Sequence, residues 1–221
     1  MTFTVKSKYL FLVLFIFISL LDVLGLLMKV SLLELFAKPL IILSLMAIYV
    51  TSVRKKNYWF LIALFFSFLG DVFLLDKNNM FLLGIAAFLI TQLIYIKIIM
   101  SHIEKSPLAN KMSAILPFAV FFMVLIYILF ENLNGFLWPV VIYGLTISLF
   151  GVVSLLNYIT KKTTATRLLL LGALLFIASD SMIALNKFYE PQEFYSVSIM
   201  ITYILAQYFI CRYMISKSST I

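Results

Sequence analysis

The chain has 221 residues, of which 64% are hydrophobic and 12% are charged, against roughly 45–50% and 25% in soluble domains. This composition excludes a soluble globular domain and indicates an integral membrane protein. The net charge of +8 comes from short clusters between apolar runs, which predicts topology signals and contacts with anionic headgroups, and no nucleic-acid partner.

Eight apolar runs divide the chain, each near the ~20 residues that cross a ~30 Å hydrocarbon core. The first run follows Lys6 and Lys8, but it is too long for a signal peptide and has no small-residue cleavage site. No Pro-, Gly- or Ser-rich linker separates the runs, so we expect one integral membrane domain over residues 1–221, an all-α bundle of eight transmembrane helices. The predicted helices cover about residues 9–28, 35–53, 58–75, 80–100, 113–130, 136–158, 168–186 and 194–215.

Lysine and arginine are distributed unevenly among the connecting segments. If eight helices alternate in direction, 13 of the 17 cations share the side that holds both termini. Cations are retained on the cytoplasmic side, so both termini are predicted to be cytoplasmic and the protein to be a multi-pass protein of the cell membrane. The 13 cations are Lys6, Lys8, Arg54, Lys55, Lys56, Lys97, Lys105, Lys111, Lys161, Lys162, Arg167, Arg212 and Lys217.

Four ionisable residues interrupt the apolar runs: Asp22, Lys38, Asp71 and Asp180. Each lies 13 to 16 residues from a cytoplasmic cation, which at ~1.5 Å per residue is roughly 20–24 Å from the inner membrane edge. An isolated charge at this depth costs about 2.5 kcal/mol or more, so such residues are candidate functional residues that pair with one another. We expect Asp71 and Asp180 to converge as catalytic residues, although each could instead join neighbouring helices by hydrogen bonding.

The other polar residues of the helices are weaker candidates. Lys38 could act on the carboxylates electrostatically or extend to the interface, and Asp22 could be a site residue or a structural partner. Further candidates for substrate binding are Gln92, Tyr95, Tyr203 and Gln207, and Tyr143 and Asn186 could line a polar cavity with them, although buried polar side chains often only join helices.

The residue inventory argues against metal and triad chemistry. The chain has one histidine, His102, in a loop, and one cysteine, Cys211, in the last apolar run. A His-rich zinc site, a Ser–His–Asp triad and an intrachain disulfide are therefore not expected. No metal and no cofactor is predicted.

Short motifs occur in order from the second predicted helix to the last. They are Lys38-Pro39-Leu40, Leu69-Gly70-Asp71-Val72-Phe73-Leu74, Phe81-x-x-Gly84-x-x-x-Phe88 with Tyr95, Gly172-Ala173-Leu174-Leu175-Phe176 before Ser179-Asp180, and Thr202-Tyr203 with Ala206-Gln207. As an ordered set they resemble the YhhN family of lysoplasmalogenase-like membrane proteins, which implies eight helices. The family pattern favours histidine at the position of Gln92, which leaves either a tolerated variant or an altered activity.

The resemblance implies hydrolysis of the vinyl ether bond of lysoplasmalogens to a fatty aldehyde and a glycerophospho-ethanolamine or -choline. Vinyl ethers are cleaved by protonation of the β-carbon to an oxocarbenium ion, addition of water and collapse of the hemiacetal. A proton donor and an anionic stabiliser or base are needed, roles that Asp71 and Asp180 can divide. Lys38 would act electrostatically or bind the phosphate. The implied partners are a lysophospholipid-type substrate and the membrane lipids.

Three other functions fit the same residues. A proton-coupled membrane transporter would use buried Asp and Lys that exchange partners. An intramembrane aspartyl protease also places two Asp on different helices, but neither Phe68 nor Leu69 supplies the first glycine of its Gly-x-Gly-Asp motif and no Tyr precedes Asp180. A structural lipid-binding protein would leave the layer of buried charges unexplained.

Overall fold

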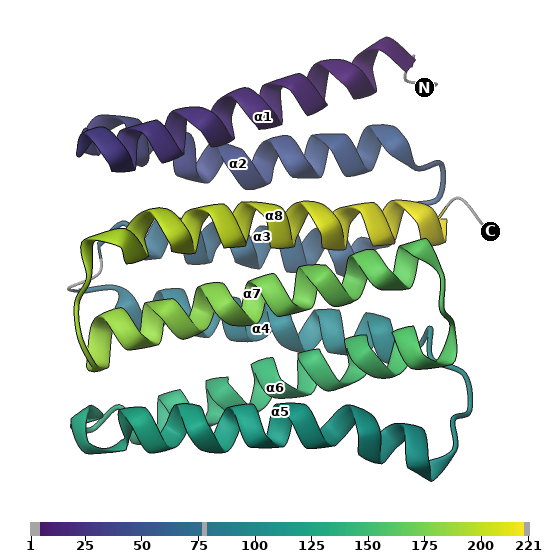
Figure 1. Ribbon diagram of the computed structural model, residues 1–221. Coiled ribbons are helices and arrows are strands. Elements are labelled where there is room, and N and C mark those ends of the chain that lie inside the picture. The colour runs from purple at the N-terminus through teal and green to yellow at the C-terminus, as the bar shows by residue number, and fades with distance from the viewer. Residues whose placement is uncertain (1–4, 77–78, 219–221) are drawn as a thin grey trace. The chain divides into compact units, whose positions relative to one another are not determined.

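The computed structural model describes residues 5–76 and 79–218, which form eight α-helices and one short 3-10 helix, Phe130–Asn132 (Figure 1). The helices occur in the predicted order, and the all-α fold with eight helices is confirmed. Lys77 and the side chains of Lys6 and Lys8, part of the charge pattern, lie outside the described residues. The helices are α1 Val5–Met28, α2 Ser31–Ser52, α3 Tyr58–Phe73, α4 Phe81–Met100, α5 Leu108–Leu129, α6 Leu137–Thr160, α7 Thr164–Phe188 and α8 Glu193–Ser218.

Seven of these helices are long and apolar enough to cross a membrane, and they indicate a multi-pass integral membrane protein. The exception is α3, whose 16 residues extend about 24 Å at ~1.5 Å per residue, less than the ~30 Å hydrocarbon core. The sequence predicts α3 to continue to residue 75, but the helix ends at Phe73. Asp76 instead closes a turn, because its carboxylate accepts hydrogen bonds from the backbone and side-chain amides of Asn79 at 3.1 and 2.9 Å.

Local polar contacts explain where several helices begin or end. Asn57 caps α3 by accepting a hydrogen bond from the Phe60 amide at 3.2 Å. The side chains of Thr163 and Thr166 form a capping box at the start of α7, which satisfies amides that have no partner in the first turn. At the end of α1, Lys29 adopts a left-handed conformation with φ 54°, and the chain leaves the helix there.

The chain divides into two compact units. The first unit comprises Met1–Thr91 and Cys211–Ile221, and the second comprises Gln92–Ile210. The boundaries fall inside α4 and α8, so each of these two helices contributes one part to each unit.

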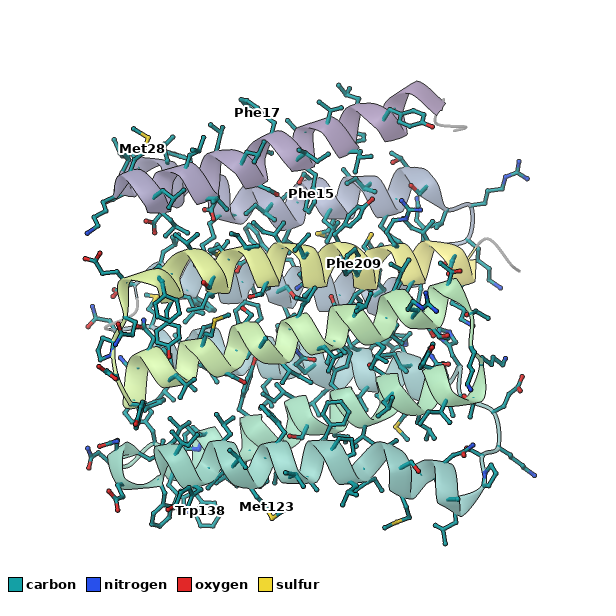
Figure 2. All side chains as sticks on the ribbon, in the orientation of Figure 1. Phe15, Phe17, Met28, Met123, Trp138 and Phe209 are labelled. Carbon is teal, nitrogen blue, oxygen red and sulfur yellow. The ribbon has the colours of Figure 1, made fainter. Side chains whose placement is uncertain are left out.

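In the first unit, α2 packs against both α1 and α3, and glycines allow α3 and α4 to approach closely. A Cβ atom at Gly70 of α3 would lie 2.7 Å from the ring of Phe88 on α4, and one at Gly84 of α4 would lie 2.7 Å from Leu74. Figure 2 shows Phe17 of α1 pointing away from α2, and this side chain is exposed. An exposed phenylalanine on an apolar helix is expected where lipid is the solvent.

In the second unit, α6 packs between α5 and α7 (Figure 1). Gly144 and Gly151, seven residues apart on α6, lie against the rings of Phe122 and Phe118 on α5. Residues seven apart share a helix face, so one face of α6 packs against α5. The next face, which carries Tyr143 and Phe150, is left for the interior of the unit.

Polar contacts join segments that the charge pattern places on one side of the membrane. Within the second unit, Lys161 before α7 forms a 2.6 Å ion pair with Glu104 before α5. Within the first unit, the hydroxyl of Tyr49 near the end of α2 lies 3.3 Å from that of Ser218 at the end of α8. Which side of the membrane these ends face stays a prediction.

Candidate functional site

Helix α7 brings Asp180 into the interior of the second unit. Gly172 and Ser179, seven residues apart, lie on the face that packs against α8: a Cβ at Gly172 would lie 3.0 Å from the Ala206 carbonyl oxygen, and the Ser179 hydroxyl donates to the Ile199 carbonyl at 3.1 Å. Asp180 follows Ser179, and in a helix of 3.6 residues per turn its side chain points about 100° away from that face. It therefore projects beside α8 toward α6.

The carboxyl group of Asp180 contacts Tyr143 of α6. The Tyr143 hydroxyl donates a 2.6 Å hydrogen bond to Oδ2 of Asp180, within the range of O–H···O hydrogen bonds in proteins. The side chains are only 8% and 7% exposed. Asp180 is therefore a buried titratable side chain in the mostly apolar helix α7, and its hydrogen-bond donor, the Tyr143 hydroxyl, is neutral.

The predicted substrate-binding residues Tyr95, Tyr203 and Gln207 are brought together in the second unit. Tyr95 of α4 donates to Oε1 of Gln207 on α8 at 2.9 Å, and Nε2 of Gln207 lies 3.4 Å from the Tyr203 hydroxyl, one turn earlier. A chain of ring contacts connects this cluster to α6 and α7. Successive centroids of Tyr95, Phe150, Phe176 and Tyr203 are 5.9, 6.3 and 5.8 Å apart.

This aromatic chain lies next to the Tyr143–Asp180 pair along both helices. Phe176 precedes Asp180 by one turn of α7, and Phe150 follows Tyr143 by two turns of α6. Because residues at these spacings share a helix face, the rings and the pair line the same side of α6 and of α7. The polar pair is therefore bounded by aromatic rings toward the Lys161–Glu104 end of the unit.

Two other predicted residues have different surroundings. Gln92 is fully buried, and within residues 5–76 and 79–218 neither atom of its amide has a hydrogen-bond partner. Asn186, considered as a residue that could line a cavity or only join helices, accepts a hydrogen bond from the Gln192 amide at 3.1 Å in the connection between α7 and α8. Its role is to shape that turn.

The first unit holds Asp71, Asp22 and Lys38. Asp71 is 2% exposed and follows Gly70, the glycine beneath the Phe88 ring. Asp22 of α1 is fully buried, and in the part of the chain that the structure describes its carboxylate accepts no hydrogen bond. Half-buried Lys38 of α2 lies within electrostatic reach of Asp22, so the structure brings together two of the predicted ionisable residues.

The predicted convergence of Asp71 and Asp180 stays a prediction, since the two residues belong to different units. The partner that sequence reasoning did not assign to Asp180 is Tyr143, which was considered as a residue that could line a polar cavity or only join helices. A count of helix positions could have found it. Tyr143 lies 17 residues before the end of α6 and Asp180 lies 16 residues after the start of α7, so the two antiparallel helices place them at one depth.

The described residues offer no metal site: in residues 5–76 and 79–218, no group of three His, Cys, Asp or Glu side chains could hold an ion. The chain matches the model of the YhhN family over residues 33–214, which include every candidate residue except Asp22. No curated protein and no solved structure gives a significant match. The family includes lysoplasmalogenases. With most of its length covered by the match, the chain belongs to the YhhN family.

Proposed function

We propose that the protein is a lysoplasmalogenase-type hydrolase that cleaves the vinyl ether bond of lysoplasmalogens within the membrane. The observation that carries this proposal is the buried carboxyl group of Asp180 with one oxygen bound by Tyr143. Vinyl ether cleavage starts with proton transfer to carbon, and a carboxyl group positioned away from water can supply that proton. Membership of a family that includes lysoplasmalogenases supports the same reaction.

In the first step, Asp180 gives its proton to the β-carbon of the vinyl ether. The electron pair of the double bond forms the new C–H bond, and the α-carbon becomes part of an oxocarbenium ion. Asp180 is left as a carboxylate that accepts the Tyr143 hydrogen bond. The negative charge formed on Asp180 balances the positive charge formed on the substrate, so electrostatic stabilisation arises where charge develops.

In the second step, water adds to the oxocarbenium carbon and returns a proton to a carboxylate, which gives a hemiacetal. Collapse of the hemiacetal breaks the bond to the glycerol oxygen, which receives a proton, and releases the fatty aldehyde. Asp71 is proposed as the second carboxylate, which stabilises the cation or takes the proton from water. Lys38 is proposed to act electrostatically, a role that a lysine fills as a compact charge.

The bound substrate is proposed to be a lysophospholipid whose chain lies among membrane lipids. The residues proposed to bind it are Gln92, Tyr95, Tyr203 and Gln207. A buried amide such as that of Gln92 costs free energy when it has no partner, and a hydroxyl of the glycerol group or the hydrolytic water would supply one. No cofactor is needed for the reaction.

A proton-coupled transporter is the second candidate function. The observation that favours it is that Asp22 on α1 lies within electrostatic reach of Lys38 on the neighbouring helix α2. Buried charges that exchange partners are a device of alternating access. A transporter would move its substrate unchanged, so formation of a new product separates the two functions.

The experiment that tests the hydrolase uses three lipids with the same headgroup. Purified protein is given a lysoplasmalogen, the saturated alkyl ether of the same chain length, and the corresponding acyl lysophospholipid. We expect fatty aldehyde from the first lipid alone, because only its double bond can be protonated on carbon. Turnover of all three lipids, or of the acyl lipid alone, would contradict the proposal.

A further inference from the structure

Tyr143 donates a hydrogen bond to Asp180, and the overall hydrolysis does not require a tyrosine. We propose that Tyr143 is a positioning residue for the reaction proposed above: it binds Oδ2 of Asp180, so that the proton is exchanged with the lipid through Oδ1. The inference rests on the proposed function and adds a residue to it.

The position of Tyr143 is fixed from two sides. Its neighbour Gly144 has no side chain, and the ring of Phe122 on α5 lies 3.1 Å from where a Cβ would stand. On the inner face, Phe150 contacts Phe176 edge-on, with centroids 6.3 Å apart. The first contact packs α6 against α5 and the second packs α6 against α7, and in this arrangement the Tyr143 hydroxyl meets the carboxyl group.

A carboxyl group has two oxygens that can each carry the proton. Because Tyr143 donates its own hydrogen to Oδ2, that oxygen acts as an acceptor and Oδ1 remains to carry the transferred proton. Tyr143 keeps its proton throughout, so the atoms balance without a further acid. Proton transfer moves from Oδ1 to the β-carbon of the lipid.

The same hydrogen bond changes in strength during the step. Hydrogen bonds to an ionised acceptor are roughly twice as strong as those between neutral groups. Tyr143 therefore binds the carboxylate formed during proton transfer more strongly than the carboxylic acid before it. An interaction that strengthens in the transition state raises kcat and leaves substrate binding little changed.

The test compares wild type with Tyr143→Phe, which removes only the hydroxyl, and with Tyr127→Phe as the matched control. Tyr127 lies on α5 and is 84% exposed, so its hydroxyl is remote from the pair. For Tyr143→Phe we expect kcat on lysoplasmalogen to fall about 10-fold or more, with KM changed by less than about 3-fold. Tyr127→Phe should match wild type in both constants.

Infrared spectroscopy supplies a measurement that does not depend on turnover. The carboxyl C=O band of Asp180 is assigned by its loss in Asp180→Asn. Tyr143→Phe should move this band to higher frequency, because a hydrogen bond to the carbonyl oxygen weakens the C=O bond. If Tyr143→Phe does not fold, 3-fluorotyrosine at position 143 keeps the shape and strengthens the donor, which should move the band to lower frequency.

The outcomes separate the two proposals. An inactive wild-type protein whose Asp180 band still responds to Tyr143 would contradict the lysoplasmalogenase function and leave the hydrogen-bonded pair intact. An active wild-type enzyme in which folded Tyr143→Phe keeps its kcat, or in which the band does not move, would overturn the role of Tyr143.

Discussion

The hydroxyl of Tyr95 on α4 donates a 2.9 Å hydrogen bond to Oε1 of Gln207 on α8, and both side chains are buried. The pair links residues 112 positions apart in the chain. Its hydrogen bond joins α4 and α8 in the interior of the second unit, so each partner satisfies a group that would otherwise be costly to bury.

The contribution of this hydrogen bond to the free energy of unfolding can be measured with two single variants and the double variant. Tyr95→Phe and Gln207→Leu are each expected to lower the free energy of unfolding by about 1 kcal/mol, because each removes a buried hydrogen bond. The double variant should lose less than the sum of the single losses. Unfolding of the four proteins in one detergent measures the difference, and strictly additive losses would contradict the pairing.

Asp22 and Lys38 permit a similar test of charge pairing. Lys38→Met leaves the buried carboxylate of Asp22 without its nearby cation, whereas Lys38→Arg keeps a positive charge. The Asp22 oxygens accept no hydrogen bond from the described residues, so Lys38 acts on them at a distance and its loss should cost less than the about 3–5 kcal/mol of a broken buried ion pair. We therefore expect Lys38→Met to lower the melting temperature and Asp22→Asn to restore part of the loss.

The melting temperature of Lys38→Met decides between the two interpretations of this lysine. If Lys38 extends to the interface, the Met variant should melt near wild type and Asp22→Asn should have the same effect with or without it. That pattern would remove Lys38 from the proposed electrostatic role.

The glycines of the second unit differ in what a methyl group would meet. At Gly172 a Cβ would lie 3.0 Å from the Ala206 carbonyl oxygen and 3.2 Å from the Ile210 amide nitrogen, both of which are backbone atoms. At Gly144 it would meet only the Phe122 ring at 3.1 and 3.2 Å, which can rotate. We expect Gly172→Ala to destabilise by about 1–3 kcal/mol.

Gly144→Ala is the matched control for this prediction. Alanine gains about 1 kcal/mol over glycine in a helix interior, so small shifts of the Phe122 ring should leave this variant near or above wild-type stability. Thermal unfolding of both variants in the same detergent is the measurement. A Gly172→Ala protein as stable as Gly144→Ala would contradict the close approach of α7 and α8.

Topology can be tested by accessibility of introduced cysteines in a Cys211→Ser background. Thirteen of 17 cations fall on the side predicted to be cytoplasmic. Cysteine at Lys55 or Lys162 should therefore react only after the membrane is permeabilised, and cysteine at Glu131 or Glu193 should react in intact cells. Reaction of any of these sites from the opposite side would contradict an alternating path of eight helices.

The helices could be predicted from the sequence because lipid requires apolar runs near a fixed length, and all eight are present. Their ends were less predictable: α5 begins at Leu108 and not at residue 113, because Pro107 is its N-cap and the first turn, with Asn110 and Lys111, extends beyond the apolar run. The end of α3 depends on the turn formed by Asp76 and Asn79, a contact that hydrophobicity does not report.

The sequence predicts which residues belong to the candidate site, but it does not predict which of them contact each other. Burial of Asp71, Asp180 and Asp22 follows from their positions in apolar runs. The bond from Tyr143 to Asp180 depends on the rotation of α6 and α7 about their axes, which is set by small residues such as Gly144 and Ser179. Counting helix positions places Tyr143 at the depth of Asp180, but the sequence does not give the rotations that turn the two side chains toward each other.

Replacing the two proposed catalytic carboxylates tests them separately. Asp180→Asn and Asp71→Asn keep the size of the side chain and remove its capacity to transfer a proton. We expect each folded variant to lose at least about 10²-fold in turnover of lysoplasmalogen, the lower range for lost acid–base catalysis. A well-folded variant with near-normal turnover would remove that residue from the catalytic roles.

Proton transfer from Asp180 to carbon is the central claim, and isotope incorporation tests it most directly. Wild type and Asp180→Asn are incubated with lysoplasmalogen in D2O, and the aldehyde is reduced at once with borohydride to prevent exchange. The account predicts that the wild-type product carries one deuterium on the carbon next to the former carbonyl, while Asp180→Asn forms product at least about 10²-fold more slowly. Aldehyde without deuterium at that carbon, or undiminished product from folded Asp180→Asn, would contradict it.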